Sequence, residues 1–397
     1  MAQINPPKYV RQILFGLQAR GHLAYLVGGC VRDVLMDIRP HDWDICTSAL
    51  PEEVLELFPG SKPTGLKHGT VTVIIGSRSA EVTTFRTEGD YRDHRRPDSV
   101  TFVSDLITDL SRRDFTMNAI ALSADGMISD PYDGVKDIQN RIIRCVGEPK
   151  LRFTEDALRM FRALRFSARL GFTIEYETCA AIEACAPLAA ELAPERVRDE
   201  IEKILLTSRP ETMGAAISFG LMKRYIPGSG WKTPNFSDIA SMPRKVLPRW
   251  VAFSIMLRKY GYIPSARDFL ISLRLDGRTV RCCADAEIML SENPPEDTLG
   301  WKRLLNRYGV DSVSCAVQAG AVILGVDREK ELKAVLKSGE CFSLKHLAVT
   351  GDDLLSLGLR GPELGEMLKF LLEYVMEYPD NNKREILLEL AKYSEES

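Results

Sequence analysis

The chain has 397 residues, which is enough for two to four domains, each with its own core. With 45% hydrophobic and 27% charged residues it has the composition of an ordinary globular protein, and no stretch approaches the roughly 20 consecutive apolar residues of a membrane helix. The net charge of −3 argues against a generic nucleic-acid binder, and the absence of a signal-peptide pattern at the N-terminus leads us to expect a cytoplasmic location without membrane attachment.

The nine cysteines and five histidines are scattered along the chain. A zinc site would need thiolates and imidazoles at short loop spacings, and the sequence contains neither a C-x-x-C pair nor a histidine cluster. We therefore expect reduced thiols, several of them core residues.

The first ~145 residues alternate short β-branched runs with helical patterns. An amphipathic helix is predicted after Pro6-Pro7, and another begins at Pro51. Strands are predicted over residues 24–27, 43–46, 70–75 and 80–85, with a hairpin turn at Gly76-Ser77-Arg78-Ser79. This pattern is typical of a small α+β domain with a mixed sheet.

From about residue 153 onward, helical periodicity replaces β-branched alternation. Helices are predicted over residues 154–169, 175–185, 194–207, 245–259, 278–290, 298–307, 327–337, 362–377 and 383–393. Breaks are expected near residues 227–230 and 294–295, where glycine and proline are concentrated. The remainder of the chain is therefore predicted to be all-α.

A glycine pair, Gly28-Gly29, follows the first predicted strand and leads into a short predicted helix. Paired glycines allow backbone amides to approach a phosphate closely, and a helix N-terminus favours an anion. Arg32 in the same segment is within reach of such a phosphate. A plain connection between strand and helix is the alternative interpretation.

Three carboxylates are candidates for a metal site. Asp42 and Asp44 are two residues apart on a predicted strand, so both side chains are expected on the same face. Glu81 lies in the second arm of the predicted hairpin, which we expect beside Asp44. Carboxylates and substrate phosphates are the ligands that Mg²⁺ prefers, and two metal ions often assist phosphoryl transfer. The alternatives are a solvated turn and an outward-facing strand residue.

The segment Arg112-Arg113-Asp114 adds a basic pair at a predicted helix start. Asp114 is a candidate cap, and Arg113 is a candidate contact to a phosphate or ribose. An exposed helix end is the alternative.

The predicted helix over residues 154–169 lies in a locally basic region: residues 141–169 contain eight Lys/Arg and three Asp/Glu. Its apolar stripe is formed by Leu158, Phe161, Leu164 and Ala168. Glu155, Asp156, Arg159 and Arg162 occupy a separate arc, and Arg165 lies near the edge of the stripe. A solvated helix face is the alternative to a functional one.

Asp156 and Arg159 are spaced i,i+3, which places a hydrogen-bond acceptor beside a donor. Cytosine and adenine both present an amine donor beside a ring-nitrogen acceptor, whereas uracil and guanine reverse this order. The pair is therefore suited to accept CTP and ATP and to reject UTP and GTP. A surface ion pair of little energetic value is the alternative.

Several motifs, in this order over residues ~20–205, resemble the class II nucleotidyltransferases, which comprise bacterial CCA-adding enzymes and poly(A) polymerases. They are Gly28-Gly29-x-Val31-Arg32-Asp33, Asp42-x-Asp44, Arg112-Arg113-Asp114-Phe115-Thr116, Asp130-Pro131, Glu155-Asp156-x-x-Arg159 and Glu195-Arg196-Val197. The resemblance implies a polymerase beta-like nucleotidyltransferase head with a mixed sheet, followed by a helical neck, body and tail. The corresponding ranges are 1–148, 149–210 with the base-reading helix, 211–330, and 331–397, the last of which would bind tRNA.

The resemblance also implies roles for individual residues. Asp42 and Asp44 would bind metal, with two Mg²⁺ ions during catalysis, and Glu81 would be the third catalytic carboxylate. The implied nucleotide-binding residues are Gly29, Arg32, Arg113, Asp156, Arg159, Arg162 and Arg165. The segment Glu195-Arg196-Val197 would brace the base-reading helix without touching substrate.

The implied activity is addition of C, C and A to the 3′ end of tRNA from CTP and ATP, without a nucleic-acid template and with release of pyrophosphate. Residues 86–102, including Arg95-Arg96-Pro97, resemble the flexible loop of CCA-adding members, which argues against an enzyme that adds only the two cytidines. An A-adding enzyme or a poly(A) polymerase is one alternative, and an inactive RNA-binding protein is another. The oligomeric state stays open, with a homodimer among the alternatives.

Overall fold

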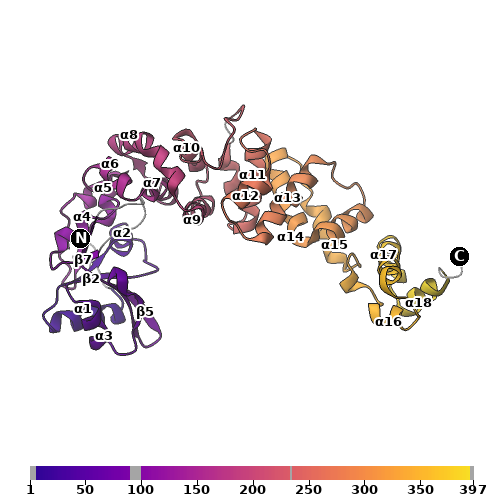
Figure 1. Cartoon of the computed structure of the whole chain (residues 1–397), viewed down its shortest axis with the longest axis horizontal. Helices are drawn as coiled ribbons and strands as arrows, with labels where there is room; N and C mark the ends of the chain where they lie inside the picture. The colour runs from indigo at the N-terminus through magenta and orange to yellow at the C-terminus, as the bar shows by residue number, and fades with distance from the viewer. Residues whose placement is uncertain (1–5, 90–99, 233–234, 394–397) are drawn as a thin grey trace. The chain divides into compact units, whose positions relative to one another are not determined.

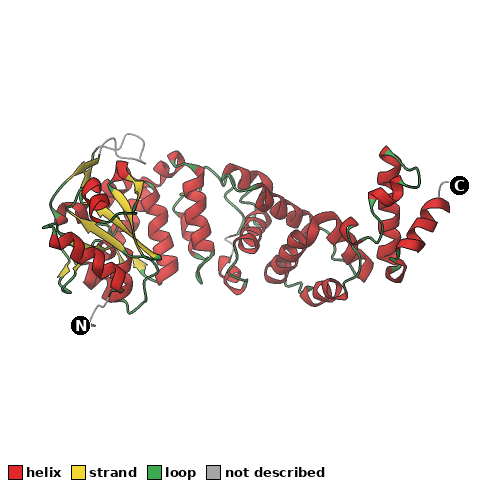
Figure 2. Ribbon diagram, turned by 90° about the horizontal axis from the view of Figure 1, so that it is seen from below, coloured by secondary structure: helices red, strands yellow, loops and turns green. Residues whose placement is uncertain are grey.

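The computed structural model describes residues 6–89, 100–232 and 235–393. The chain divides into two compact units, Met1–Arg224 and Tyr225–Ser397. Strands, drawn yellow in Figure 2, gather toward the N-terminal part of the chain, while helices dominate the rest of the described residues. This is the predicted α+β class. Within the described ranges, no helix is long and apolar enough to cross a membrane.

A seven-stranded mixed sheet forms the centre of the N-terminal part of the first unit, with the strand order β3-β4-β5-β2-β1-β8-β9. The strands are β1 (Ala24–Val27), β2 (Asp44–Thr47), β3 (Lys62–Gly65), β4 (Thr70–Ile75), β5 (Arg78–Thr84), β8 (Ala121–Ser123) and β9 (Ile128–Ser129). Neighbouring strands are antiparallel except β2 and β5, which pair in parallel with Asp44 opposite Glu81. The start of β2 is therefore level with residue 81 of the hairpin.

Helices α1 (Lys8–Ala19) and α3 (Pro51–Leu57) contact this sheet (Figure 1). The apolar residues of α1 recur at helical spacing, and Val10, Ile13, Leu14 and Leu17 are all buried. A second cluster contains Val27, Cys46, Phe85, Leu106, Leu110, Ala119, Ala121 and Val146, and it joins the sheet to α4 (Leu106–Ser111). The sheet therefore has buried side chains on both sides, which holds its strands rigidly.

Two details of the head differ from the sequence prediction. The hairpin turn is shorter than predicted, because β5 already begins at Arg78. The ends of the predicted loop over residues 86–102 pair as strands β6 (Arg86–Glu88) and β7 (Val100–Phe102). The segment Arg95-Arg96-Pro97 lies outside the described residues.

The helices that follow the sheet in the first unit are α5 (Gly134–Asn140), α6 (Pro149–Glu155), α7 (Leu158–Leu170), α8 (Tyr176–Cys185), α9 (Pro194–Leu205) and α10 (Thr212–Ser218). The single helix predicted over residues 154–169 is wrong, because the backbone leaves the helical region at Asp156 (φ −139°, ψ 99°). The Asp156 side chain accepts a hydrogen bond from Leu158 N at 3.1 Å. A short polar side chain that bonds a nearby amide competes with helix continuation, and here it separates α6 from α7.

The second unit begins with five helices: α11 (Val246–Lys259), α12 (Ala266–Ser272), α13 (Gly277–Ser291), α14 (Thr298–Leu324) and α15 (Glu329–Ser338). The helix predicted over residues 298–307 is the first part of α14, whose backbone breaks at Gly309 (φ 78°, ψ 162°) and then continues. The short α12 was not predicted. Helices of two turns are hard to recognise from periodicity alone.

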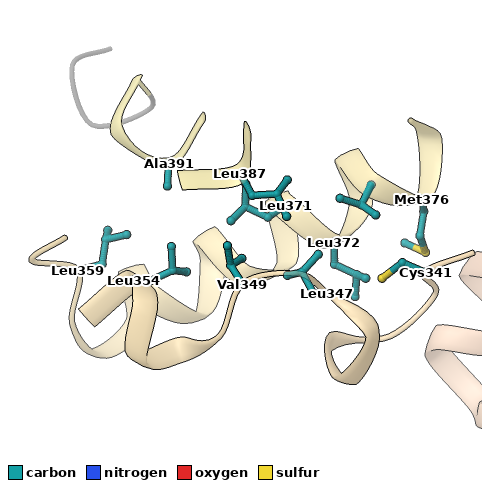
Figure 3. Packing of buried hydrophobic residues seen from close by; sticks show 11 residues of the cluster. Cys341, Leu347, Val349, Leu354, Leu359, Leu371, Leu372, Met376, Leu387 and Ala391 are labelled. Atoms are coloured by element: carbon teal, nitrogen blue, oxygen red, sulfur yellow. The ribbon is translucent and has the colours of Figure 1, made fainter. Parts of the chain in front are cut away.

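The C-terminal part of the second unit contains α16 (Gly351–Leu355), α17 (Gly361–Glu377) and α18 (Arg384–Tyr393). Figure 3 shows their small core, in which Leu354, Leu371, Leu372 and Leu387 are among the buried side chains. Lys302 of α14 is also buried, and its ammonium donates to Met376 O at 2.8 Å. All nine cysteines of the chain are free.

Candidate active site

A cleft of about 640 Å³ lies within the first unit, and arginine dominates its walls. It is lined by nine arginines, Arg32, Arg86, Arg112, Arg113, Arg159, Arg162, Arg165, Arg169 and Arg196, and by three aspartates, Asp44, Asp114 and Asp156. The other lining residues are Gly28, Gly29, His68, Asn118, Leu158 and Phe166. An excess of guanidinium groups over carboxylates suits a polyanionic ligand such as a nucleoside triphosphate.

At one wall of the cleft, the half-buried Asp44 begins β2 and lies opposite Glu81 of β5. Burial and the neighbouring Glu81 raise the pKa of Asp44, Arg113 opposes this, and Asp42 adds to the increase. Among the described residues, no three His, Cys, Asp or Glu side chains form a group that is able to hold a metal ion. The structure thus places Glu81 opposite Asp44 on the neighbouring strand, but the described residues do not form a complete set of metal ligands.

Asp42 differs from the prediction in one respect. It lies in an exposed bend before β2, which begins only at Asp44. Strand alternation therefore does not orient Asp42 and Asp44 alike, although both carboxylates are near enough to interact electrostatically.

The turn between β1 and α2 (Gly29–Leu35) requires glycine at residue 28. Gly28 has φ 72°, and a Cβ atom built on it would lie 3.1 Å from Nη1 of Arg113 and 3.9 Å from Oδ2 of Asp44. The missing side chain lets both charged groups lie against the backbone of the turn. Gly29 follows as the first residue of α2 and also lines the cleft.

Arg32 lines the cleft but is only 2% exposed. Its Nε donates to Asp33 at 2.9 Å, and its Nη1 donates to Asn118 at 2.8 Å. Most of the guanidinium N–H donors of Arg32 thus bond within the protein, and the bond to Asn118 connects α2 to the segment that follows α4.

The pair Arg112-Arg113 follows the end of α4 at Ser111, so the predicted position at a helix start is wrong. Both guanidinium groups donate to the fully buried Asp109, at 2.7 and 3.2 Å. Burial alone would raise the pKa of Asp109, but the two arginines hold it below its usual value. Asp109 was missed in the sequence, although its i,i+3 and i,i+4 spacing to the arginines was a usable signal.

Asp114 does not cap a helix as predicted, since the residue before η2 (Thr116–Asn118) is Phe115. Its carboxylate instead accepts from Arg162 Nη2 at 2.5 Å, Asn118 Nδ2 at 3.1 Å and Phe115 N at 2.8 Å. Burial would raise the pKa of Asp114, but the ion pair with Arg162 and these hydrogen bonds lower it to about 2. Asp114 therefore holds Arg162 at the wall of the cleft.

The arginines of α7 recur every three or four residues and bond to acids from different parts of the fold. The pairs are Arg159–Glu155, Arg162–Asp114, Arg165–Glu200 and Arg169–Asp33, with shortest distances of 2.6, 2.5, 2.5 and 3.4 Å. Phe166 lies among them, with Cζ of Arg165 4.2 Å from its ring centroid. This network fixes long, flexible side chains in place before any ligand binds.

The two predicted base-reading residues both line the cleft but bond to different partners. Asp156 accepts from Arg196 Nη2 at 2.9 Å. Arg159 donates to Glu155 at 2.6 Å and to Arg112 O at 2.9 Å. Arg196 itself lines the cleft, and its buried Nη1 has no hydrogen-bond partner among the described residues. Its expected role was support for the helix alone.

Comparison with known proteins gives two matching family models. The model described as "Poly A polymerase head domain" matches residues 24–144, which contain the sheet, Asp44, Glu81 and Arg113. The model described as "Probable RNA and SrmB- binding site of polymerase A" matches residues 171–229.

Proteins that are similar over nearly the whole chain identify the family more specifically. The CCA-adding enzyme of Geobacillus sp. (strain WCH70) is 39% identical over 385 residues, which cover 94% of this chain and 93% of the relative. The structure of the Bacillus stearothermophilus CCA-adding enzyme in complex with CTP has 34% identity and a TM-score of 0.84, and covers 99% of this chain and 98% of that one. The Thermotoga maritima CCA-adding enzyme complexed with tRNA, at 23% identity and a TM-score of 0.68, shares the fold. The chain therefore belongs to the family of CCA-adding enzymes.

Proposed function

We propose that this chain adds C, C and A to the 3′ end of tRNA from CTP and ATP, without a nucleic-acid template. The observation that supports this most directly is the single cleft in which Asp44 lies at one wall and the Asp156 region at another, with nine arginines around them. Membership in the CCA-adding enzyme family supports the same substrates. The proposal includes the division into head (1–148), neck (149–210), body (211–330) and tail (331–397).

In the proposed reaction the 3′-oxygen of the RNA attacks the α-phosphorus of the nucleotide. The bond between the α-phosphorus and its bridging oxygen to the β-phosphate breaks, and pyrophosphate leaves with that electron pair. Arg113, beside the glycine turn, and Arg162 and Arg165 on α7 would bind the phosphates, whose negative charge they complement. Because these arginines are already positioned by acidic partners, little ordering is needed when the nucleotide binds.

The carboxylates at and before β2 and on β5 have the chemistry that divalent metal ions prefer, although in the described residues they do not form a complete ligand set. Asp42, Asp44 and Glu81 offer only carboxylate oxygens, which Mg²⁺ prefers. Burial and repulsion from the two other acids raise the pKa of Asp44, and a cation would relieve that repulsion. When bound, two Mg²⁺ ions would favour deprotonation of the attacking hydroxyl and neutralise charge on pyrophosphate. Asp42 and Asp44 are the proposed metal ligands, and Glu81 is the third carboxylate of the site.

Base selection is assigned to Asp156 and Arg159. A carboxylate acceptor beside a guanidinium donor matches the edge shared by cytosine and adenine. Uracil and guanine would place a carbonyl against the carboxylate and leave buried polar groups unpaired, which discriminates strongly.

Incubation with tRNA that lacks its 3′ terminus, and with CTP and ATP separately and together, tests the proposal. We expect two cytidines from CTP alone and one further adenosine when both nucleotides are present. Addition of adenosine only, to tRNA already ending in CC, would indicate an A-adding enzyme. Long adenosine tails on unstructured RNA would indicate a poly(A) polymerase, and incorporation of neither nucleotide would refute the assignment.

A further inference from the structure

Asp109, near the end of α4, is a fully buried carboxylate. It is not one of the described residues that line the nucleotide cleft, although Arg112 and Arg113 are. Burial of a carboxylate is costly unless charged or polar groups compensate it. The groups that bond Asp109 therefore indicate what this acid supports.

The two carboxylate oxygens of Asp109 accept from different groups. Oδ1 accepts from Arg112 Nε at 3.0 Å and Nη2 at 2.7 Å, and from the backbone N–H of Arg86 at 3.3 Å. Oδ2 accepts from Arg113 Nη2 at 3.2 Å. Since Asp109 holds Arg112 by two short bonds and Arg113 by one longer bond, its stronger hold is on Arg112.

The end of α4 also bonds to two arginines of α6 and α7. Arg112 O accepts from Arg159 Nη2 at 2.9 Å, and Ser111 O accepts from Arg152 Nη1 at 3.0 Å. The last carbonyls of a helix have no partner within the helix, so they are available to these guanidinium groups. Glu155 pairs with both arginines, at 2.5 and 2.6 Å, and connects them to each other.

A continuous series of contacts thus runs from Asp109 to Arg159. The Asp109 carboxylate fixes the Arg112 side chain, and the Arg112 carbonyl bonds the Arg159 guanidinium. Because Arg159 is only 7% exposed where it lines the cleft, its orientation depends on the groups that it bonds. Asp156 is held separately, by Arg196.

We propose that Asp109 is a positioning residue that sets the base selectivity of the cleft through Arg112 and Arg159. The inference rests on the proposed function, in which Arg159 reads the base. Selectivity then depends on an acid that does not contact the nucleotide. The bond from Arg113 to Asp109 does not distinguish bases, because all four nucleoside triphosphates carry the same phosphates.

The test compares the full chain with Asp109→Asn, which keeps the shape of the side chain and removes its charge. Asp137→Asn is the matched control. Asp137 is also a buried acid of the first unit, accepts from Arg144 Nε at 3.0 Å, and is not among the described residues that line the cleft. Equilibrium dialysis of CTP and of UTP, with Mg²⁺ and without RNA, measures the ratio of the two Kd values. Thermal unfolding measures the stability of each variant.

In Asp109→Asn the preference for CTP over UTP should fall about fivefold to tenfold, because Arg112 no longer fixes the carbonyl that orients Arg159. The lost negative charge strengthens the attraction of both triphosphates equally, so it cancels in the ratio. Asp137→Asn should also lower the melting temperature, but it should keep the ratio within about twofold of the wild type.

A second variant interrupts the same series of contacts at Arg112. Arg112→Met removes the guanidinium that Asp109 holds and keeps the backbone carbonyl that Arg159 bonds. The preference should fall as in Asp109→Asn. The double variant should lose no more than the larger single loss, because both changes break one linkage. The Arg112 side chain is 17% exposed, so Arg112→Met alone decides the outcome if Asp109→Asn does not fold.

The inference is overturned if the folded variants keep the wild-type ratio, if Asp137→Asn loses as much preference, or if the two single losses add in the double variant. Equal binding of CTP and UTP by the wild type would also overturn it. The dialysis contains no tRNA, so its result is independent of the addition reaction. A wild type that prefers CTP but adds no nucleotide to tRNA would refute the proposed function and leave the role of Asp109 intact.

Discussion

Asp44 at the start of β2 and Glu81 of β5 lie directly opposite each other in the only parallel strand pair of the described seven-stranded sheet. The pairing depends on the connection through α3 and the hairpin, which returns the chain beside β2 in the same direction. Two acids 37 positions apart in the chain, from 44 to 81, thus occupy paired positions, with Asp44 half-buried and Glu81 exposed. Their proximity is one cause of the raised pKa of Asp44, and it is a feature that a bound cation would exploit.

Replacement of this aspartate tests the proposed metal site. Asp44→Asn should reduce kcat by about a thousandfold, which corresponds to about 4 kcal/mol of lost transition-state stabilisation. In the metal-free protein the same change should raise the melting temperature at pH 7. Since burial and Glu81 raise the pKa of Asp44 in the folded state, its protonated carboxyl favours folding below the ordinary pKa of 3.8. That contribution is lost as the pH rises through the folded value, so the ionised carboxylate destabilises the fold at pH 7. Incorporation assays and thermal unfolding measure the two effects, and a lower melting temperature would contradict the electrostatic account.

The ion pair between Asp114 and Arg162 predicts a pH-dependent stability. The folded pKa of Asp114 is about 2, against an ordinary value of 3.8, so its stabilising contribution is complete above about pH 4 and is lost as the pH falls through about 2. The shift corresponds to about 2 kcal/mol. Asp114→Asn should therefore lower the free energy of unfolding at pH 7 by about that amount, and by clearly less near pH 2. Urea unfolding at both pH values measures the difference, and an equal loss at both would contradict the assignment.

Asp156→Ala should affect base selection more than nucleotide affinity. A good bidentate contact contributes about 1–3 kcal/mol of discrimination, so the preference for CTP and ATP over UTP and GTP should fall by about tenfold to a hundredfold. The KM values for CTP and ATP should change less. Competitive incorporation with all four nucleotides measures the preference, and unchanged ratios would refute a base-reading role for Asp156.

Arg196 should act through Asp156, to whose carboxylate it donates at 2.9 Å. In Arg196→Met the carboxylate loses this support, so the base preference should fall in the same direction as in Asp156→Ala, by about tenfold. Arg196→Lys should recover part of the loss. The control is Arg198→Met on the same helix, since Arg198 pairs with the exposed Asp199. If the double variant of Asp156 and Arg196 loses as much as the sum of both single variants, the two residues act independently.

Arg113→Ala should weaken the binding of CTP and the binding of ATP equally. Arg113 lies against the glycine turn and beside Asp44, where it is expected to contact phosphates and not the base. Loss of a charge-assisted contact of about 1.5–3 kcal/mol would raise KM for CTP and ATP by about tenfold to a hundredfold. Steady-state kinetics with each nucleotide measures this, and a selective effect on one nucleotide would place Arg113 near the base.

Two errors of the sequence prediction involve side-chain hydrogen bonds to nearby groups. The helix over residues 154–169 was predicted from its apolar stripe, but the Asp156 side chain bonds Leu158 N and interrupts the helix at that position. The pair Arg112-Arg113 was predicted at a helix start, whereas it follows a helix and is held by the buried Asp109. At Asp156 one side-chain hydrogen bond outweighs the periodicity of several residues, and at Arg112-Arg113 the bonds to Asp109 hold the pair beside the helix that it follows.

The α+β class, most of the longer helices, and the segments that carry Asp44, Glu81 and the arginines of α7 were predictable from the amino-acid sequence alone. Runs of β-branched residues, helical periodicity and short motifs are properties of neighbours along the chain, and they can be read directly. The packed fold was needed to establish that β5 lies parallel to β2, which acid pairs with each arginine, and that Asp156 bonds to Arg196. These contacts join residues up to 136 positions apart, as in Arg169 and Asp33, and they depend on how the elements pack and not on any local pattern.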